Sequence, residues 1–142
     1  MSAGSHLILV VDDDLAVRES LKFALELEGL EVHVCASGAD LLAHPHLMRA
    51  DCLVLDYHMP GMDGFAVLSA LKARDSRVPV ILITGNATAA IRRRAAIAGV
   101  RHVVEKPLLD STLIESINDI LNSKVQSACE RVPRSGCSAN AT

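Results

Sequence analysis

Aromatic side chains are scarce in this chain, which has two Phe, one Tyr and no Trp among its 142 residues. Proteins that bind single-stranded nucleic acid stack the bases on aromatic rings, and the sequence offers too few for such a platform. The formal net charge of −3 gives no excess of basic side chains for a phosphate backbone. We therefore expect no nucleic-acid partner.

Long apolar runs are also absent, since no run approaches the roughly 20 residues needed to cross a bilayer. Residues 1–6 lack a basic stretch followed by an apolar core, so we expect no signal peptide. The cysteines, at Cys35, Cys52, Cys129 and Cys137, lack the spacing of a metal site. Two lie in apolar, strand-like segments, where a cysteine is typically a small buried hydrophobe. These features favour a cytoplasmic protein with no membrane partner.

Half of the residues are apolar and 22% are charged, a balance typical of one globular domain with its own core. Short apolar segments alternate with helical patterns along the chain. Strands are predicted at 7–11, 32–36, 52–55, 80–83 and 100–104, and helices at 16–28, 39–43, 65–73, 87–98 and 110–122. This alternation predicts an α/β fold, with a doubly wound, five-stranded parallel sheet.

The C-terminal residues lose this pattern. Residues 123–142 are rich in Ser, Ala, Asn and Cys and show no apolar periodicity. We therefore predict a domain over residues 1–122 and a flexible tail over residues 123–142.

Polar side chains follow four of the predicted strands, at the point where each strand ends. They are Asp12-Asp13-Asp14, Asp56, Thr84-Gly85 and Glu105-Lys106-Pro107. The carboxyl ends of parallel strands share one edge of a sheet, and ligands bind in the crevice there. We expect three carboxylates, one hydroxyl and one amine to form a single site.

The charges of this predicted site indicate its chemistry. Asp12, Asp13 and Asp56 would repel one another, and a hard divalent cation such as Mg²⁺ removes that repulsion. A carboxylate can accept a phosphoryl group, whose negative charge Lys106 and the hydroxyl of Thr84 would stabilise. Gly85 leaves space beside the incoming group because it has no side chain.

Four motifs in this order resemble the receiver domain of two-component response regulators. They are Val11-Asp12-Asp13-Asp14, Leu55-Asp56-Tyr57-His58-Met59-Pro60-Gly61-Met62-Asp63-Gly64, Ile83-Thr84-Gly85 and Glu105-Lys106-Pro107. The resemblance covers about residues 7–121. Its Thr-Gly and Glu-Lys-Pro motifs are most similar to those of the nitrogen-fixation-type regulators. It implies a flavodoxin-like receiver fold with strand order 2-1-3-4-5.

The resemblance also implies a role for each site residue. Asp56 would be the phosphoacceptor, Asp12 and Asp13 the metal-holding acids, and the backbone carbonyl of His58 a further Mg²⁺ ligand. Thr84 would be the switch hydroxyl. Lys106 would contact the phosphoryl group and precede a cis peptide bond to Pro107.

The implied partners are a histidine kinase or phosphotransfer protein as donor and a downstream protein that the sequence does not name. We expect a phosphoprotein of phosphorelay signal transduction rather than an enzyme, and phosphorylation-dependent dimerisation stays open. No DNA-binding effector follows the receiver pattern, so we predict a single-domain regulator. It would dock through its fourth helix, fifth strand and fifth helix, or pass the phosphoryl group onward.

One departure from the family concerns switching. Receivers usually carry Tyr or Phe three residues before the lysine, where this chain has Val103. Switching would therefore proceed through shifts near Thr84 and residues 87–99.

Several residues admit a plainer interpretation. Asp14 fits an N-cap of the first helix better than a metal ligand. His44-Pro45-His46 has metal-like spacing but fits a solvated loop, and Arg92-Arg93-Arg94 fits the solvated face of a helix. His58 and Asn86 would either tune hydrolysis of the phosphoryl group or simply be solvated.

Other functions compete with the receiver interpretation. A flavodoxin-like carrier of flavin or nucleotide needs a phosphate loop after the first strand, and Asp12-Asp13-Asp14 would repel the ligand. An aspartate-based phosphatase places a second acid two residues after its nucleophile, where this chain has His58. A phosphorylation-independent docking module is the third alternative, and the complete set of site residues argues against it.

Overall fold

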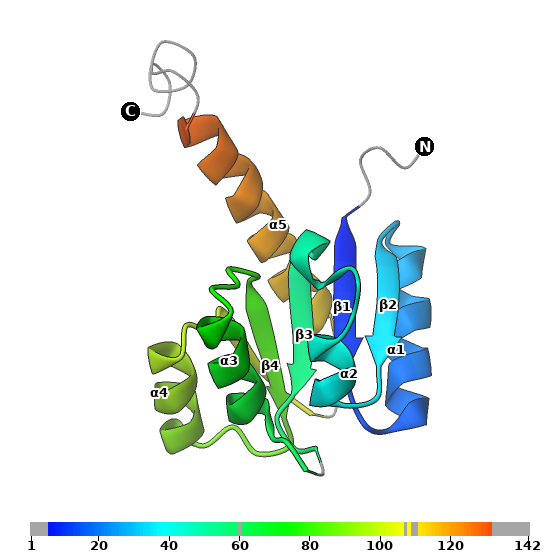
Figure 1. Ribbon diagram of the computed structural model, residues 1–142. Helices are drawn as coiled ribbons and strands as arrows, with labels where there is room; N and C mark the ends of the chain where they lie inside the picture. Colours follow the sequence, from blue (N-terminus) through cyan, green and yellow to red (C-terminus); the bar gives the residue numbers. More distant parts are fainter. Residues whose placement is uncertain (1–5, 60, 107, 109–110, 132–142) are drawn as a thin grey trace.

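The computed structural model describes residues 6–59, 61–106, 108 and 111–131, with the side chains of 124–131 excepted. Its centre is a five-stranded parallel sheet (Figure 1). The strands are β1 (Leu7–Val11), β2 (Glu31–Cys35), β3 (Cys52–Asp56), β4 (Val80–Thr84) and β5 (His102–Glu105). The order β2-β1-β3-β4-β5 confirms the predicted fold class and topology.

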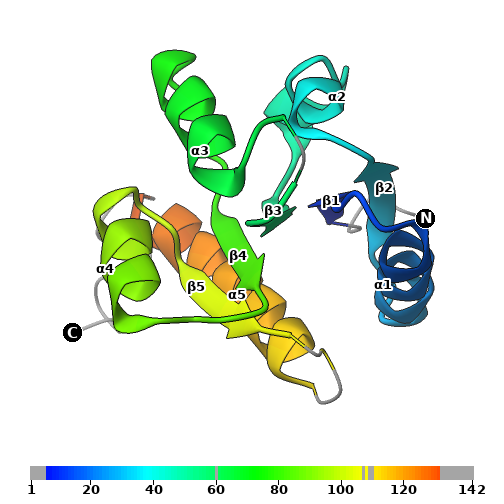
Figure 2. The same cartoon turned by 90° about the horizontal axis from the view of Figure 1, so that it is seen from below.

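Helices cover both faces of the sheet. They are α1 (Leu15–Leu27), α2 (Gly38–Leu42), α3 (Gly64–Ala73), α4 (Ala89–Ile97) and α5 (Thr112–Arg131). Buried side chains of α1 and α5 pack on one face, and those of α2, α3 and α4 on the other. Figure 2 shows these two layers when the strands are viewed nearly end-on.

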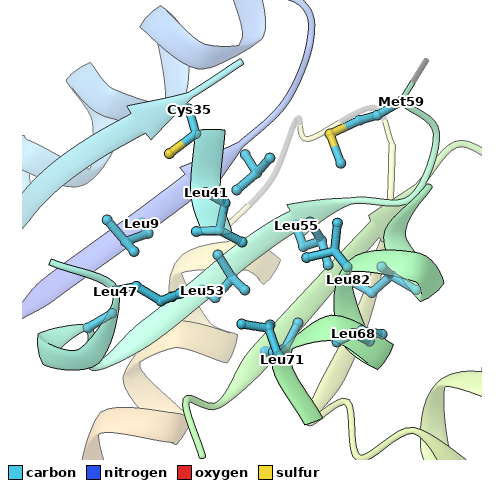
Figure 3. Close-up of a cluster of buried hydrophobic side chains, with 14 of the residues drawn as sticks. Leu9, Cys35, Leu41, Leu47, Leu53, Leu55, Met59, Leu68, Leu71 and Leu82 are labelled. Atoms are coloured by element: carbon cyan, nitrogen blue, oxygen red, sulfur yellow. The ribbon is translucent and has the colours of Figure 1, made fainter. Parts of the chain in front are cut away.

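The core explains why the central strands are continuous apolar runs. In β1, Leu7, Leu9 and Val11 belong to the cluster on the α2–α4 face, whereas Ile8 and Val10 belong to the cluster on the α1–α5 face. Both sides of the strand are therefore buried, as is usual for parallel sheets. Figure 3 shows the first cluster, in which leucines from β1, β3 and β4 meet those of α2 and α3.

The helix ends match their sequence signals. Asp14 is the N-cap of α1, as predicted, and its carboxylate accepts a hydrogen bond from the backbone N–H of Ala16 at 2.9 Å. Gly29 and Gly99 follow α1 and α4 with φ of +86° and +89°. This left-handed conformation, which glycine adopts without a Cβ penalty, stops both helices near their predicted ends.

The last helix differs from its prediction. α5 continues to Arg131, so the expected end at Asn122 is wrong. Residues 123–131 lack a regular apolar face but include good helix formers such as Lys124 and Ala128, and backbone hydrogen bonds need no apolar face. Asp110 and residues 132–142 lie outside the described residues, so the division into domain and tail stays a prediction.

A short 3₁₀ helix, two cysteines and the apolar character of the helices also relate to the sequence predictions. A short 3₁₀ helix, η2 (Leu47–Arg49), was not predicted and buries Leu47. Cys35 and Cys52 are buried and free, as expected, and burial raises the pKa of the Cys35 thiol to about 11. None of the described helices is long and apolar enough to span a bilayer.

Gly64, the first residue of α3, is a tightly packed position. A Cβ there would lie 3.0 Å from Leu82 Cδ1 and 3.1 Å from the backbone Cα of Tyr57, which cannot move aside without shifting the loop after β3. We predict that Gly64→Ala lowers the free energy of unfolding by about 1–3 kcal/mol, the usual cost of overpacking. Urea denaturation measures this change.

Gly85→Ala is the matched control, because a Cβ at Gly85 meets nothing within 4 Å. Equal effects of the two substitutions on the urea midpoint would contradict the packing argument.

Candidate functional site

The predicted acidic site lies at the carboxyl edge of the sheet. Asp12 directly follows β1 and Asp56 ends β3, so strand pairing brings these two residues to neighbouring positions. One carboxylate oxygen each of Asp12, Asp13 and Asp56 lies within 4.8 Å of the others. Within the described part of the chain, no other group of three or more His, Cys, Asp or Glu residues has ligand atoms this close.

Lys106 completes the site from the opposite side. Its Nζ lies 3.4 Å from Asp12 Oδ2 and 3.3 Å from Asp56 Oδ1. The backbone N–H of Lys106 donates to the carbonyl of Thr84 at 2.8 Å, which holds the lysine at the end of the sheet. One ammonium group thus bridges two carboxylates that are almost fully buried.

Asp12 is held by three hydrogen bonds, two that it accepts and one that it donates. Its Oδ1 accepts from the N–H of Asp14 at 2.9 Å, and its carbonyl accepts from Arg18 Nη1 at 2.8 Å. Its own N–H donates to the carbonyl of Cys35 at 3.2 Å. The remaining Oδ2 is buried and has no hydrogen-bond partner among the described residues, although the Lys106 ammonium lies 3.4 Å away. Arg18 is a contributor that the sequence analysis missed, although it lies on the first turn of α1 after the acidic loop.

The electrostatics of the pocket favour a cation. Burial, together with the nearby charge of Asp12, raises the pKa of Asp56 against the opposing effects of Lys106 and the His58 backbone. Burial alone would lower the pKa of Lys106, but Asp56 and Asp12 outweigh it and raise that pKa. Lys106 is therefore protonated at neutral pH, and a single positive charge faces three acids. A buried acceptor without a hydrogen bond and an excess of carboxylates fit a hard divalent cation.

Thr84 lies beside Asp56 at the end of β4. It is buried, and its hydroxyl accepts a hydrogen bond from the N–H of Asn86 at 3.2 Å. Ile83 pairs with Asp56, and Thr84 pairs with Glu105 just before Lys106. The space around Gly85 is open, as expected, because a Cβ there would touch nothing.

The loop after Asp56 is connected to α4 through aromatic rings. The Tyr57 ring stacks on exposed His58 with centroids 5.1 Å apart and meets Phe65 edge-on at 5.4 Å. The guanidinium of Arg94 lies 4.1 Å from the centre of the Phe65 ring. Arg94, interpreted from sequence as part of a solvated face, is exposed but also makes this cation–π contact.

The remaining predicted features lie at or near this edge. Pro107 and the predicted cis peptide bond fall outside the described residues. Val103 is half-buried and packs against the α2–α4 cluster. A groove of about 620 Å³ opens beside the acidic site, lined by α1 side chains together with Lys106 and Leu108.

The family model of the response regulator receiver domain matches residues 8–118. The chain is 38% identical over 113 residues to the C4-dicarboxylate transport transcriptional regulatory protein DctR of Rhodobacter capsulatus, covering 78% of this chain and 57% of DctR. It is 35% identical over 126 residues to the transcriptional regulatory protein FixJ of Azorhizobium caulinodans, covering 89% of this chain and 60% of FixJ. The chain thus spans little more than half the length of these relatives.

A solved structure shows the same arrangement of elements. The response regulator protein TrrA of Thermotoga maritima superposes with a TM-score of 0.70 at 29% identity, covering 81% of this chain and 98% of TrrA. The sequence motifs and the three-dimensional arrangement therefore point to the same family.

The raised pKa of Asp56 has a consequence for stability. An acid with a raised pKa in the folded state ionises more readily in the unfolded chain. Its charge therefore destabilises the fold progressively as pH rises from the unfolded value, about 3.9, through the folded pKa. We predict that Asp56→Asn increases the free energy of unfolding at neutral pH in EDTA, with no gain below about pH 3.9. Urea denaturation at both pH values measures this.

Glu19→Gln, which removes an exposed acid from α1, is the control and should leave stability unchanged at either pH. A less stable Asp56→Asn variant at neutral pH would show that the carboxylate stabilises the pocket through Lys106 instead.

Proposed function

The chain belongs to the response regulator receiver domain family, and we propose that Asp56 accepts a phosphoryl group in a Mg²⁺-dependent reaction. The observation that carries this proposal is the contact of Lys106 Nζ with both Asp56 Oδ1 and Asp12 Oδ2. This contact places the protonated amine of Lys106 beside the carboxylate of Asp56 that would attack phosphorus. The TrrA structure, described as a complex with Mg²⁺ and BeF, supports the same use of the equivalent pocket.

Asp12, Asp13 and Asp56 would hold the Mg²⁺ ion together with the backbone carbonyl of His58. The buried Oδ2 of Asp12, which lacks a hydrogen bond, is the ligand atom most in need of a cation. When bound, the ion supplies positive charge that neutralises the carboxylates and the phosphoryl oxygens.

The proposed phosphoryl transfer is a single displacement at phosphorus. A carboxylate oxygen of Asp56 attacks the phosphorus of a phosphohistidine, the new O–P bond forms, and the N–P bond breaks. The electron pair of that bond returns to the donor imidazole, which takes a proton from water. Later, a water molecule attacks the phosphorus of the acyl phosphate and releases inorganic phosphate, restoring the Asp56 carboxylate.

Lys106 and Thr84 would stabilise the transferred group. The Lys106 ammonium already contacts the acceptor carboxylate and would pair with a phosphoryl oxygen. The Thr84 hydroxyl now accepts from Asn86 and would instead donate to a second phosphoryl oxygen. The open space at Gly85 leaves room for the group between them.

The donor would be a histidine kinase or a phosphotransfer protein. The groove along α1 supports this assignment, because it is largely apolar and ends at Lys106 beside the acceptor. A helical donor seated there would present its phosphohistidine to Asp56. We propose a cytoplasmic signalling role of this kind rather than an enzyme that turns over a substrate.

The output would be a change of shape passed to a downstream protein or an onward phosphoryl transfer. Because Val103 replaces the usual aromatic residue, the change would run from Thr84 into α4. The edge-on rings of Tyr57 and Phe65, with Arg94 above Phe65, supply a second contact between the acceptor loop and that helix. The relatives are transcriptional regulators longer than this chain, and single-domain action stays our proposal.

Acetyl phosphate is the donor that tests phosphorylation without a known kinase. We predict that the intact mass of the wild-type protein rises by one phosphoryl group with Mg²⁺ and not with EDTA, and that Asp56→Asn shows no gain. Lys106→Met should slow the gain on the order of 100-fold, since one charge-stabilising donor is lost. Mass spectrometry over a time course measures all of these.

Lys72→Met, which removes an exposed lysine from α3, is the control and should react at the wild-type rate. No mass gain in any condition, or an equal gain in Asp56→Asn, would refute the proposed acceptor and favour a phosphorylation-independent docking module.

The route from Thr84 into α4 gives a second test. With Mg²⁺ and beryllofluoride as a phosphoryl mimic, we predict that amide resonances of residues 89–97 shift in the wild-type protein. Thr84→Ala should still bind the mimic but lose most of these shifts, because it lacks the hydroxyl group that would turn toward the phosphoryl mimic. Two-dimensional ¹⁵N NMR measures the shifts. Ser69→Ala, which removes an exposed hydroxyl from α3, should keep them, and full shifts in Thr84→Ala would contradict this route.

A further inference from the structure

Three histidines form a compact cluster away from the acidic pocket. The ring centroids of His33, His44 and His46 lie 5.4 Å, 5.3 Å and 5.5 Å apart in pairs. All three residues are half-buried. The sequence analysis treated His44 and His46 as a solvated loop and did not connect them with His33, which lies in another element.

The fold brings these rings together on one side of an edge strand. His33 lies in β2 two residues before Cys35, whose side chain belongs to the α2–α4 cluster, so both point to that face. His44 and His46 lie in the segment that follows α2, and α2 packs on that same face (Figure 2). The N–H of His46 donates to Nδ1 of His44 at 3.0 Å, and Pro45 between them restricts the backbone.

Glu31 adds a carboxylate to the cluster. Its Oε2 lies 3.0 Å from Nε2 of His33 and 3.7 Å from Nη2 of Arg49. The cluster therefore offers imidazole nitrogens and one carboxylate group as possible ligands.

We propose that Glu31, His33, His44 and His46 bind a divalent transition metal ion such as Zn²⁺. Imidazole and carboxylate together are a common ligand set for Zn²⁺, which prefers four tetrahedral ligands. With Zn–N bonds of about 2.0–2.1 Å, imidazoles on one tetrahedral ion place their ring centroids about 5 Å apart. The observed centroid spacings agree with that value to within a few tenths of an ångström. The nitrogens of the three rings do not all lie within 4.8 Å of one another, so the rings would turn toward the ion on binding.

Binding would exchange hydrogen-bond partners for metal bonds. The ion would replace the proton shared by His33 Nε2 and Glu31 Oε2, whose 3.0 Å separation is close to that of two ligand atoms on one Zn²⁺. It would also replace the His46 N–H as the partner of His44 Nδ1. These exchanges need only rotation about side-chain bonds, and they would tie the edge strand β2 to the segment after α2.

This site is separate from the proposed phosphorylation site. Glu31 pairs with Leu7 at the start of β1, whereas Asp12 follows the end of that strand. Five residues of strand at about 3.3 Å per residue separate Glu31 from the level of Asp12 by roughly 16 Å. The two sites also differ in ligand chemistry, so saturating Mg²⁺ occupies the carboxylates without competing for the imidazoles.

Calorimetric titration of the full chain with Zn²⁺, in buffer containing millimolar Mg²⁺ and at a pH about one unit above the ordinary imidazole pKa of about 6.5, tests the proposal. We expect one tight site in the wild-type protein. His44→Gln and His33→Gln should each weaken Zn²⁺ binding at least 10- to 100-fold, the loss that even an indirect partner of a zinc ligand causes. In NMR spectra, Zn²⁺ should shift the imidazole resonances of His33, His44 and His46 together.

His102→Gln is the matched control. His102 Nε2 also contacts a carboxylate, Asp119 Oδ2 at 2.9 Å, but it lies on the opposite edge strand β5 and belongs to no histidine cluster. This variant should bind Zn²⁺ as the wild type does. Equal affinities of wild type, His33→Gln and His44→Gln would overturn the proposal, as would an equal loss in His102→Gln. Circular dichroism of each variant separates lost binding from lost folding.

Discussion

The repulsion between buried carboxylates at one edge of the sheet is the constraint on which the rest of the structure depends. Asp12 and Asp56 are almost fully buried, and Lys106 is the only cation among the described residues that forms an ion pair with either carboxylate. The repulsion between the two carboxylates would be relieved if the strands that carry them could separate. The continuous apolar strands β1, β3 and β4 prevent this, because both of their faces are buried. The core therefore holds together charges that would otherwise move apart.

The connections after these strands serve the same purpose. Asp14 caps α1 immediately after Asp12, and Asp63 caps α3 soon after Asp56. Each cap fixes where a helix starts, and so fixes the short loop that precedes it. The close contact of Gly64 with Tyr57 adds a second restraint on the loop after β3. These fixed helix starts would keep Asp56, the proposed acceptor, within reach of an incoming phosphorus without rearrangement.

Much of this could be predicted from the sequence, because the relevant signals are local. Apolar runs predicted the buried strands, and polar residues at their ends predicted the site, since parallel strands end at a common edge. The contact of Arg94 with Phe65 and the histidine cluster could not be predicted, because neither lies where strands end at a common edge. The full length of α5 could not be predicted either, because its last turns carry no apolar pattern. Contacts between elements depend on register and side-chain direction, which periodicity does not encode.

The two candidate metal sites illustrate how one fold can separate two ions. At the carboxyl edge, three carboxylates favour a small hard cation that also accepts phosphoryl oxygens as ligands. At the start of β2, half-exposed imidazoles favour a softer ion, which would act on the stability of an edge strand rather than on phosphorylation. Only β1 lies between β2 and β3 in the sheet. A metal that stiffens β2 would therefore also restrain β1, which ends directly before Asp12. Coupling between the sites, if measured, would therefore pass through β1.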